Sequence, residues 1–111
     1  MPFTIAYNPG DIVLIGFPYT DLQGVSKRPA VVLYDSADQD ILAARITTQE
    51  YFTETDYKII NWKGCGLLAE SYVRLSKQAT IEKRYILKQL GILAVSEIEN
   101  LKAILKKMFS L

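Results

Sequence analysis

Short apolar runs separated by turn residues make up most of this chain, and few of them are long enough to form a helix. Residues 11–17 are continuous, apolar and rich in β-branched side chains, which predicts a strand buried on both faces. Residues 18–28 then form a predicted polar loop. The next two predicted strands are 30–34 and 41–48. In a regular strand over 41–48, residues 41, 43, 45 and 47 share one face.

The second half continues this pattern with weaker signals. Residues 57–62 are the predicted fourth strand. Residues 71–75 alternate between apolar and polar, as a half-buried strand does. Thr80-Ile81 is predicted to begin a short turn. Residues 86–93 are predicted to form a strand or extended segment interrupted at Gly91.

The C-terminal residues carry the one clear helical pattern. Ser96 and Glu99 have the spacing of a capping box, and apolar residues then recur every three or four positions. This predicts a helix over 97–109 that packs its apolar stripe on a sheet. Six strands followed by one helix indicate an α+β, mainly β domain, or a small β-barrel with an added helix. The whole chain, 1–111, fits a single domain.

The sequence contains no histidine and one cysteine, Cys65, which restricts the chemistry that the chain can perform. A Ser-His-Asp triad, a Cys-His pair and a two-histidine acid–base pair are all excluded. No internal disulfide can form. The side chains that zinc sites prefer are nearly absent, so we expect neither a metal nor another cofactor.

The net charge of +1 conceals an uneven distribution. Residues 1–73 carry five basic and nine acidic side chains, whereas residues 74–111 carry eight basic and three acidic ones. A basic half can meet an anionic partner, although a solvated strand and helix surface explains it equally well. No apolar run reaches the length of a membrane span, and no signal peptide is recognisable, so we expect a cytoplasmic protein without a membrane partner.

Five short motifs follow one another in an order that resembles the MazF/PemK toxins. They are Pro-Gly-Asp-Ile-Val-Leu at 9–14, Phe-Pro-Tyr-Thr-Asp-Leu-Gln-Gly at 17–24, Lys-Arg-Pro-Ala-Val-Val-Leu at 27–33, Ile-Thr-Thr-Gln at 46–49, and Val-Arg-Leu at 73–75 followed by Thr-Ile-Glu-Lys at 80–83. The resemblance covers roughly residues 9–108. It implies a small SH3-like β-barrel with a C-terminal helix, of the kind that CcdB and MazF share, and a homodimer.

The resemblance also implies a function. Such a toxin is a metal-independent endoribonuclease that cleaves single-stranded RNA by attack of the 2′-hydroxyl on the adjacent phosphodiester, leaving a 2′,3′-cyclic phosphate and a 5′-hydroxyl. Its nucleophile belongs to the substrate, so the protein orients the chain and stabilises charge. A cognate antitoxin protein is the implied second partner.

By motif position, Arg28 and Thr47 are the candidate catalytic residues. The Arg28 guanidinium can hold a phosphate with two hydrogen bonds, but its high pKa argues against a role as general base. The Thr47 hydroxyl can donate to a phosphate oxygen. If the strand is regular, Thr48 points to the opposite face, and only one of the two threonines faces the site.

Seven further residues are candidate RNA contacts, of which the aromatic one can stack on an unpaired base and the lysines can bind phosphates. They are Tyr19, Thr20, Lys27, Thr48, Gln49, Lys77 and Lys83. For each lysine a solvated surface position is the competing interpretation, and for Tyr19 it is packing against the barrel.

Two other functions remain open at this point. A CcdB-like gyrase-binding toxin shares the expected barrel but acts through protein binding, and it needs no phosphate-binding arginine. A non-catalytic SH3-like binding module needs none either, so loss of Arg28 would not alter its action.

Overall fold

The computed structural model describes residues 5–18 and 25–111 and contains six strands, a short 3-10 helix and one α-helix. In chain order they are β1 (Asp11–Pro18), β2 (Val25–Asp35), β3 (Asp40–Thr47), β4 (Asp56–Lys58), β5 (Tyr72–Glu82), η1 (Lys83–Tyr85), β6 (Ile86–Ile92) and α1 (Val95–Met108). The predicted mainly β, α+β composition is therefore confirmed.

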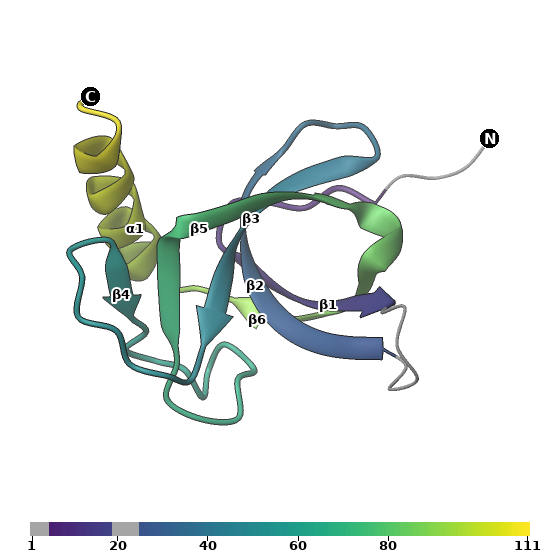
Figure 1. Ribbon diagram of the computed structural model, residues 1–111, viewed down its shortest axis with the longest axis horizontal. Helices are drawn as coiled ribbons and strands as arrows, with labels where there is room; N and C mark the ends of the chain where they lie inside the picture. Colours follow the sequence, from purple (N-terminus) through teal and green to yellow (C-terminus); the bar gives the residue numbers. More distant parts are fainter. Residues whose placement is uncertain (1–4, 19–24) are drawn as a thin grey trace.

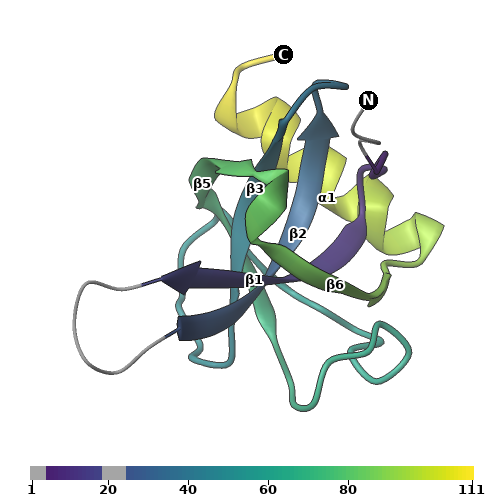
Figure 2. The ribbon, with the colours of Figure 1, turned by 90° about the vertical axis from the view of Figure 1, so that its right-hand side faces the viewer.

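All six strands belong to one antiparallel sheet in the order β4-β5-β3-β2-β1-β6. β5 continues through η1 directly into β6, although β6 lies at the other end of the sheet. The sheet must therefore curl until its two sides approach each other, and Figures 1 and 2 show this barrel-like curvature. The barrel is not closed, because the two edge strands, β4 and β6, are not hydrogen-bonded to each other.

One face of the sheet packs against α1. Ile12, Val31 and Ala44 from the central strands join Leu101 of the helix in a buried cluster. α1 lies beside β5 and β4 at one end of the molecule (Figure 1). In the described residues, no helix is long and apolar enough to cross a bilayer.

The inner face of the curl holds a second apolar cluster. Val13, Ile15, Val32, Ile41 and Ala43 are buried there. Adjacent strand residues alternate between the two clusters, which is why residues 11–17 are apolar at nearly every position. This second cluster lies beneath the candidate site.

The predicted loop over 18–28 is wrong at its end, because β2 already begins at Val25. Lys27 and Arg28 are strand residues that pair with Gly16 and Ile15 of β1. The sequence signal was masked by Pro29, which usually excludes a central strand. Here β2 begins to pair with β3 only at Ala30. At Pro29 the strand pairs with β1 alone, so the lack of an N–H on proline costs no hydrogen bond to β3.

Two further predicted boundaries are wrong. The fourth strand ends at Lys58, and residues 60–66 form turns instead. The turn expected at Thr80-Ile81 is strand, because β5 stays paired with β3 as far as Glu82. Long-range pairing, which a local pattern does not contain, decides both cases.

The capping box is also wrong. The N-cap of α1 is Ala94, and Ser96 lies inside the helix. The helix start is fixed by tertiary contacts of the adjacent Glu97, which is 2% exposed. Its carboxylate accepts hydrogen bonds from the Tyr57 hydroxyl and from the backbone N–H groups of Ile60 and Asn61.

Candidate functional site

Arg28 lies on the boundary between two neighbouring pockets on the curled sheet. The first has a volume of about 320 Å³ and the second of about 140 Å³. Both are lined by Arg28 and Pro29, and no other residue lines both. The Arg28 side chain is exposed at the surface, since β2 pairs only with β1 at this point.

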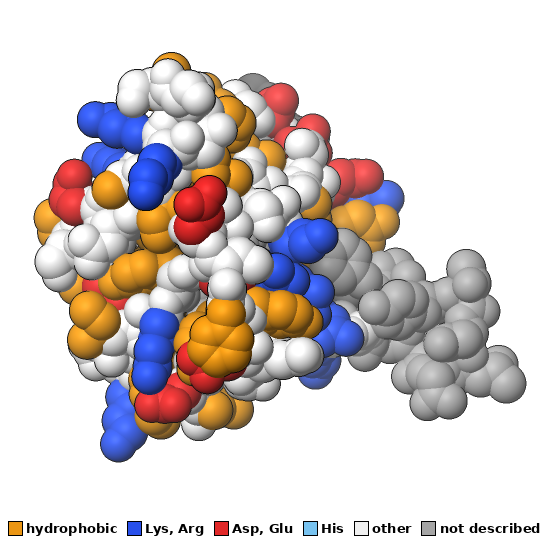
Figure 3. Space-filling view, turned by 60° about the vertical axis from the view of Figure 1, so that its left-hand side comes forward, with side chains coloured by type: hydrophobic (Ala, Val, Ile, Leu, Met, Phe, Trp, Pro, Cys, Tyr) orange, Lys and Arg blue, Asp and Glu red, His pale blue; other side chains and the backbone are white. Residues whose placement is uncertain are grey.

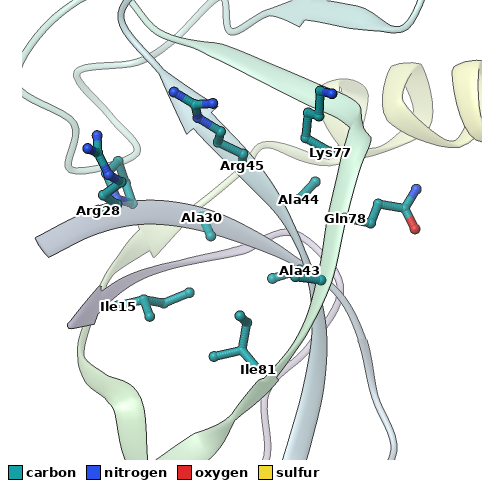
Figure 4. Close-up of a pocket in the computed structure, with 11 residues that line it drawn as sticks. Ile15, Arg28, Ala30, Ala43, Ala44, Arg45, Lys77, Gln78 and Ile81 are labelled. Atoms are coloured by element: carbon teal, nitrogen blue, oxygen red, sulfur yellow. The ribbon is translucent and has the colours of Figure 1, made fainter. Parts of the chain in front are cut away.

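The first pocket combines an apolar floor with a basic rim. Ile15, Ala43 and Ile81 contribute to the floor from β1, β3 and β5. Arg28, Arg45 and Lys77 contribute three positive charges, and none of the lining residues that the structure describes is acidic. Figure 4 shows the three basic side chains extending from β2, β3 and β5 on one side, with Ile15 and Ile81 on the other.

A β-bulge in β5 places Lys77 at this rim. Arg45 of β3 pairs with Arg74, but the preceding Ala44 pairs with Gln78, so three residues of β5 have no counterpart in β3. The Gln78 side-chain amide donates to the Leu75 carbonyl at 2.7 Å and holds the bulge together. Bulges commonly redirect a side chain next to a functional site.

The described part of the chain does not neutralise the cations at the first pocket. Arg28, Arg45 and Lys77 form no ion pair within the ranges 5–18 and 25–111. Arg74, which pairs with Arg45 across the strands, is different. Its Nε is 2.9 Å from Asp56, and its guanidinium lies 3.6 Å from the Tyr51 ring.

The surface therefore carries a local excess of positive charge. Figure 3 shows Lys and Arg side chains gathered right of the centre of one face, with others scattered singly. Like charges gathered on one surface repel one another. An anion bound between Arg28, Arg45 and Lys77 would reduce that repulsion, which makes this face suited to a polyanion.

The second pocket is lined by polar residues from the ends of β2 and β3. Lys27, Thr47, Thr48 and Ser71 lie around it. Thr47 and Thr48 both line this pocket, because β3 ends at Thr47 and strand alternation stops there. The Thr47 hydroxyl oxygen accepts a hydrogen bond from the Gln49 N–H at 3.1 Å. Its own proton has no acceptor among the described residues and is available for a ligand.

Two further predicted contacts, Lys83 and Gln49, are not brought together with Arg28. Lys83 is 2.9 Å from Asp35, and both side chains are only 8% exposed, so this lysine belongs to a structural ion pair. Gln49 is exposed and lines neither pocket. Tyr19 and Thr20 lie outside the described residues.

The lining residues that the sequence analysis did not single out include Arg45 and Ser71. Arg45 shares a strand face with Thr47, and that alternation was the available signal. Ser71 is buried, and its hydroxyl donates to the Ala69 carbonyl at 2.8 Å while the residue lines the second pocket. No local sequence pattern marks Ser71, because the β4–β5 connection brings it to Thr47.

The described residues offer no cluster of three or more Cys, Asp or Glu side chains that could hold a metal ion. Cys65 is 1% exposed, and burial raises the pKa of its thiol, with Glu97 raising it further. A buried, protonated thiol is a poor nucleophile. The groups gathered at the two pockets can bind and orient an anionic ligand and donate hydrogen bonds to it.

A family model described as PemK-like, MazF-like toxin of type II toxin–antitoxin systems matches residues 8–109. The chain belongs to this family. The match includes every described residue of both pockets. No curated protein sequence matches the chain.

Solved structures share the fold of this MazF-like toxin. The Form-II MazE–MazF structure from Deinococcus radiodurans has a TM-score of 0.77 at 16% identity, covering 97% of this chain and 99% of the other. An endoribonuclease in complex with its cognate antitoxin, from Mycobacterial species, has a TM-score of 0.76 at 18% identity, with coverages of 96% and 97%. Mycobacterium tuberculosis toxin MazF-mt6 has a TM-score of 0.73 at 22% identity, with coverages of 94% and 98%.

Proposed function

We propose that this chain is an endoribonuclease that cleaves single-stranded RNA without a metal ion. The observation that carries the proposal is the position of Arg28 between a basic, apolar-floored pocket and a pocket with two threonine side chains. Family membership and the fold shared with structures described as endoribonucleases support it. The substrate supplies the nucleophile, its 2′-hydroxyl, which attacks the adjacent phosphorus and expels the 5′-oxygen of the next nucleotide.

Arg28 is the residue proposed to bind the scissile phosphate. Its guanidinium offers parallel N–H donors that match two phosphate oxygens. The phosphorane gains negative charge during attack, so a fixed cation there stabilises the transition state more than the ground state. A general-base role is not part of the proposal.

Thr47 is the proposed second donor to the phosphate. Because its oxygen already accepts from the Gln49 N–H, its hydroxyl proton points away from that bond. The second pocket places Thr48 and Lys27 nearby as additional binding groups. Lys83 is not among the proposed RNA contacts, because its ammonium group is paired with the Asp35 carboxylate.

A cognate antitoxin and a second copy of the chain are the proposed protein partners. Structures that share the fold include one described as being in complex with its cognate antitoxin. An antitoxin segment that covers Arg28 would block access of RNA. We also propose that the protein acts in the cytoplasm, where its RNA substrate would lie.

The test is cleavage of a mixed-sequence single-stranded RNA in EDTA, followed by mapping of the new ends. Wild-type protein should cut and leave a 2′,3′-cyclic phosphate and a 5′-hydroxyl. Arg28→Ala should lower kcat by about 100-fold or more, as loss of one transition-state donor does in other enzymes. Arg84→Ala is the matched control, because Arg84 is exposed on η1 and lines neither pocket. Absence of cutting across varied RNAs would reject the proposal and direct attention to gyrase binding.

A further inference from the structure

We propose that the first pocket is a nucleotide subsite beside the scissile phosphate, in which Arg45 and Lys77 hold the neighbouring phosphate and the apolar floor receives a base. This inference rests on the proposed function. It adds two residues that no motif of the resemblance includes. It also assigns a ligand to a pocket that cleavage at Arg28 does not itself require.

The lining of the pocket indicates a ligand with an apolar body and more than one negative charge. Pro29, Ala30, Ala79 and Ile81 provide aliphatic surface, and small side chains leave the space open. Three cations border it, and within residues 5–18 and 25–111 no acidic residue lines it. A nucleotide has both properties, because its base is flat and weakly polar on its faces while its phosphates carry the charge.

The position of Arg28 fixes how such a nucleotide relates to the cut. Arg28 borders both pockets, so a phosphate bound to it has the first pocket directly on one side. Successive phosphates of a single strand are separated by one nucleotide. The nucleotide flanking the scissile phosphate therefore places its base over Ala43 and Ala79, and its outer phosphate between Arg45 and Lys77.

Arg45 and Lys77 are both free to bind that phosphate. Arg74, opposite Arg45, is occupied by Asp56 and Tyr51, whereas Arg45 and Lys77 have no acidic partner in the described part of the chain. The bulge in β5 leaves three residues without a pairing partner in β3. It also directs Lys77 to the pocket. The surface thus has a built cation pair without a counter-ion.

The experiment measures binding apart from cleavage. End mapping with the wild-type protein first locates the cleaved bond in the RNA. An RNA with 2′-deoxyribose on the 5′ side of that bond can bind but cannot be cleaved. Its dissociation constant is then measured against salt concentration for wild type, Arg45→Gln, Lys77→Gln and Ala79→Ile. Arg84→Gln is the matched control, because Arg84 is exposed and pairs with Glu82 away from both pockets.

The two kinds of variant should differ in their salt dependence. Arg45→Gln and Lys77→Gln should each weaken binding about tenfold and lower the slope of log affinity against log salt by about 0.7, the contribution of one phosphate contact in a single strand. Ala79→Ile keeps every charge, so it should weaken binding without changing the slope. Arg84→Gln should bind as wild type does.

A second measurement locates the base. Abasic nucleotides are placed one at a time around the cut in the same RNA. At one flanking position the abasic RNA should bind the wild type more weakly than the intact RNA does. Ala79→Ile should bind the abasic and intact RNAs equally, because its larger side chain has already displaced that base. Thermal unfolding confirms that each variant is folded.

The outcomes separate the inference from the proposed function. If wild type cuts RNA but Arg45→Gln, Lys77→Gln and Ala79→Ile bind with its affinity and salt slope, the nucleotide subsite is rejected, and the pocket is left for another ligand such as an acidic peptide. If the folded wild type cuts no RNA, the proposed function fails, and the subsite fails with it.

Discussion

Ala37 adopts a backbone conformation that its side chain disfavours. Its φ is 61°, in the left-handed region, and its N–H donates to the Asp35 carboxylate at 2.8 Å in a tight turn. A β-carbon in this region costs about 1–2 kcal/mol, part of which glycine offsets by its greater freedom when unfolded. Ala37→Gly should therefore raise the free energy of unfolding by about 0.5–1 kcal/mol in urea titration.

Ala103, which is exposed within α1, supplies the control for that change. Ala103→Gly should lower the free energy of unfolding by about 1 kcal/mol, because glycine is unfavourable inside a helix. Effects of the same sign at both positions would contradict the strain assigned to Ala37.

The Asp35–Lys83 pair makes stability depend on pH. Burial pushes the pKa of the Asp35 carboxyl up, but hydrogen bonds from the Tyr7 N–H, the Lys83 ammonium and the Ala37 N–H outweigh it and hold the pKa below its usual value. A carboxyl whose pKa is lowered by folding contributes stability above its unfolded pKa, near 4, and loses it as the pH falls through the folded value. Lys83→Met should lower the free energy of unfolding by about 2 kcal/mol at pH 7.

The pH at which this cost disappears is the diagnostic measurement. The difference in unfolding free energy between wild type and Lys83→Met should shrink as the pH falls below about 4, because a protonated Asp35 no longer attracts Lys83. Lys88→Met, at an exposed position of β6, should match wild type at each pH. A constant difference between pH 7 and pH 3 would contradict the proposed ion-pair origin.

At the scale of elements, Glu97 fastens α1 to the β4–β5 connection. Glu97→Gln replaces a carboxylate that accepts three hydrogen bonds with an amide whose NH₂ faces N–H groups, so it should cost about 2–3 kcal/mol of unfolding free energy. Glu99→Gln is the matched control on the same helix. Glu99 is 63% exposed and pairs only with Lys102, so its replacement should cost less than about 1 kcal/mol. Equal costs would show that Glu97 is not an anchor.

Elements were predictable where one local pattern was sufficient. The apolar run that became β1 and the helical stripe of α1 were both visible in the sequence, since each buries a face fixed by its own periodicity. The β2 start, the length of β5 and the true N-cap were not visible. Each depends on a distant partner: β1 for Arg28, β3 for Ile81, and the Ile60 N–H for Glu97.

At the scale of the whole molecule, the distribution of charge along the sequence did not locate the basic site. Arg28 and Arg45 come from the acidic N-terminal portion, and Lys77 comes from the basic remainder. The strand order of the sheet places β2, β3 and β5, which carry them, side by side. Arg28 and Thr47 could be named from motifs, and strand alternation offered a signal for Arg45, whereas Ser71 required the folded arrangement.

The most direct test of the account compares two RNAs that differ at one atom. After the cut has been located, the same oligonucleotide is made with ribose or with 2′-deoxyribose on the 5′ side of the cut, and both are incubated with wild-type protein in EDTA. The account predicts cleavage of the first at that bond and none of the second, because the nucleophile has been removed. Equal cleavage of both would contradict it, since water would then be the nucleophile.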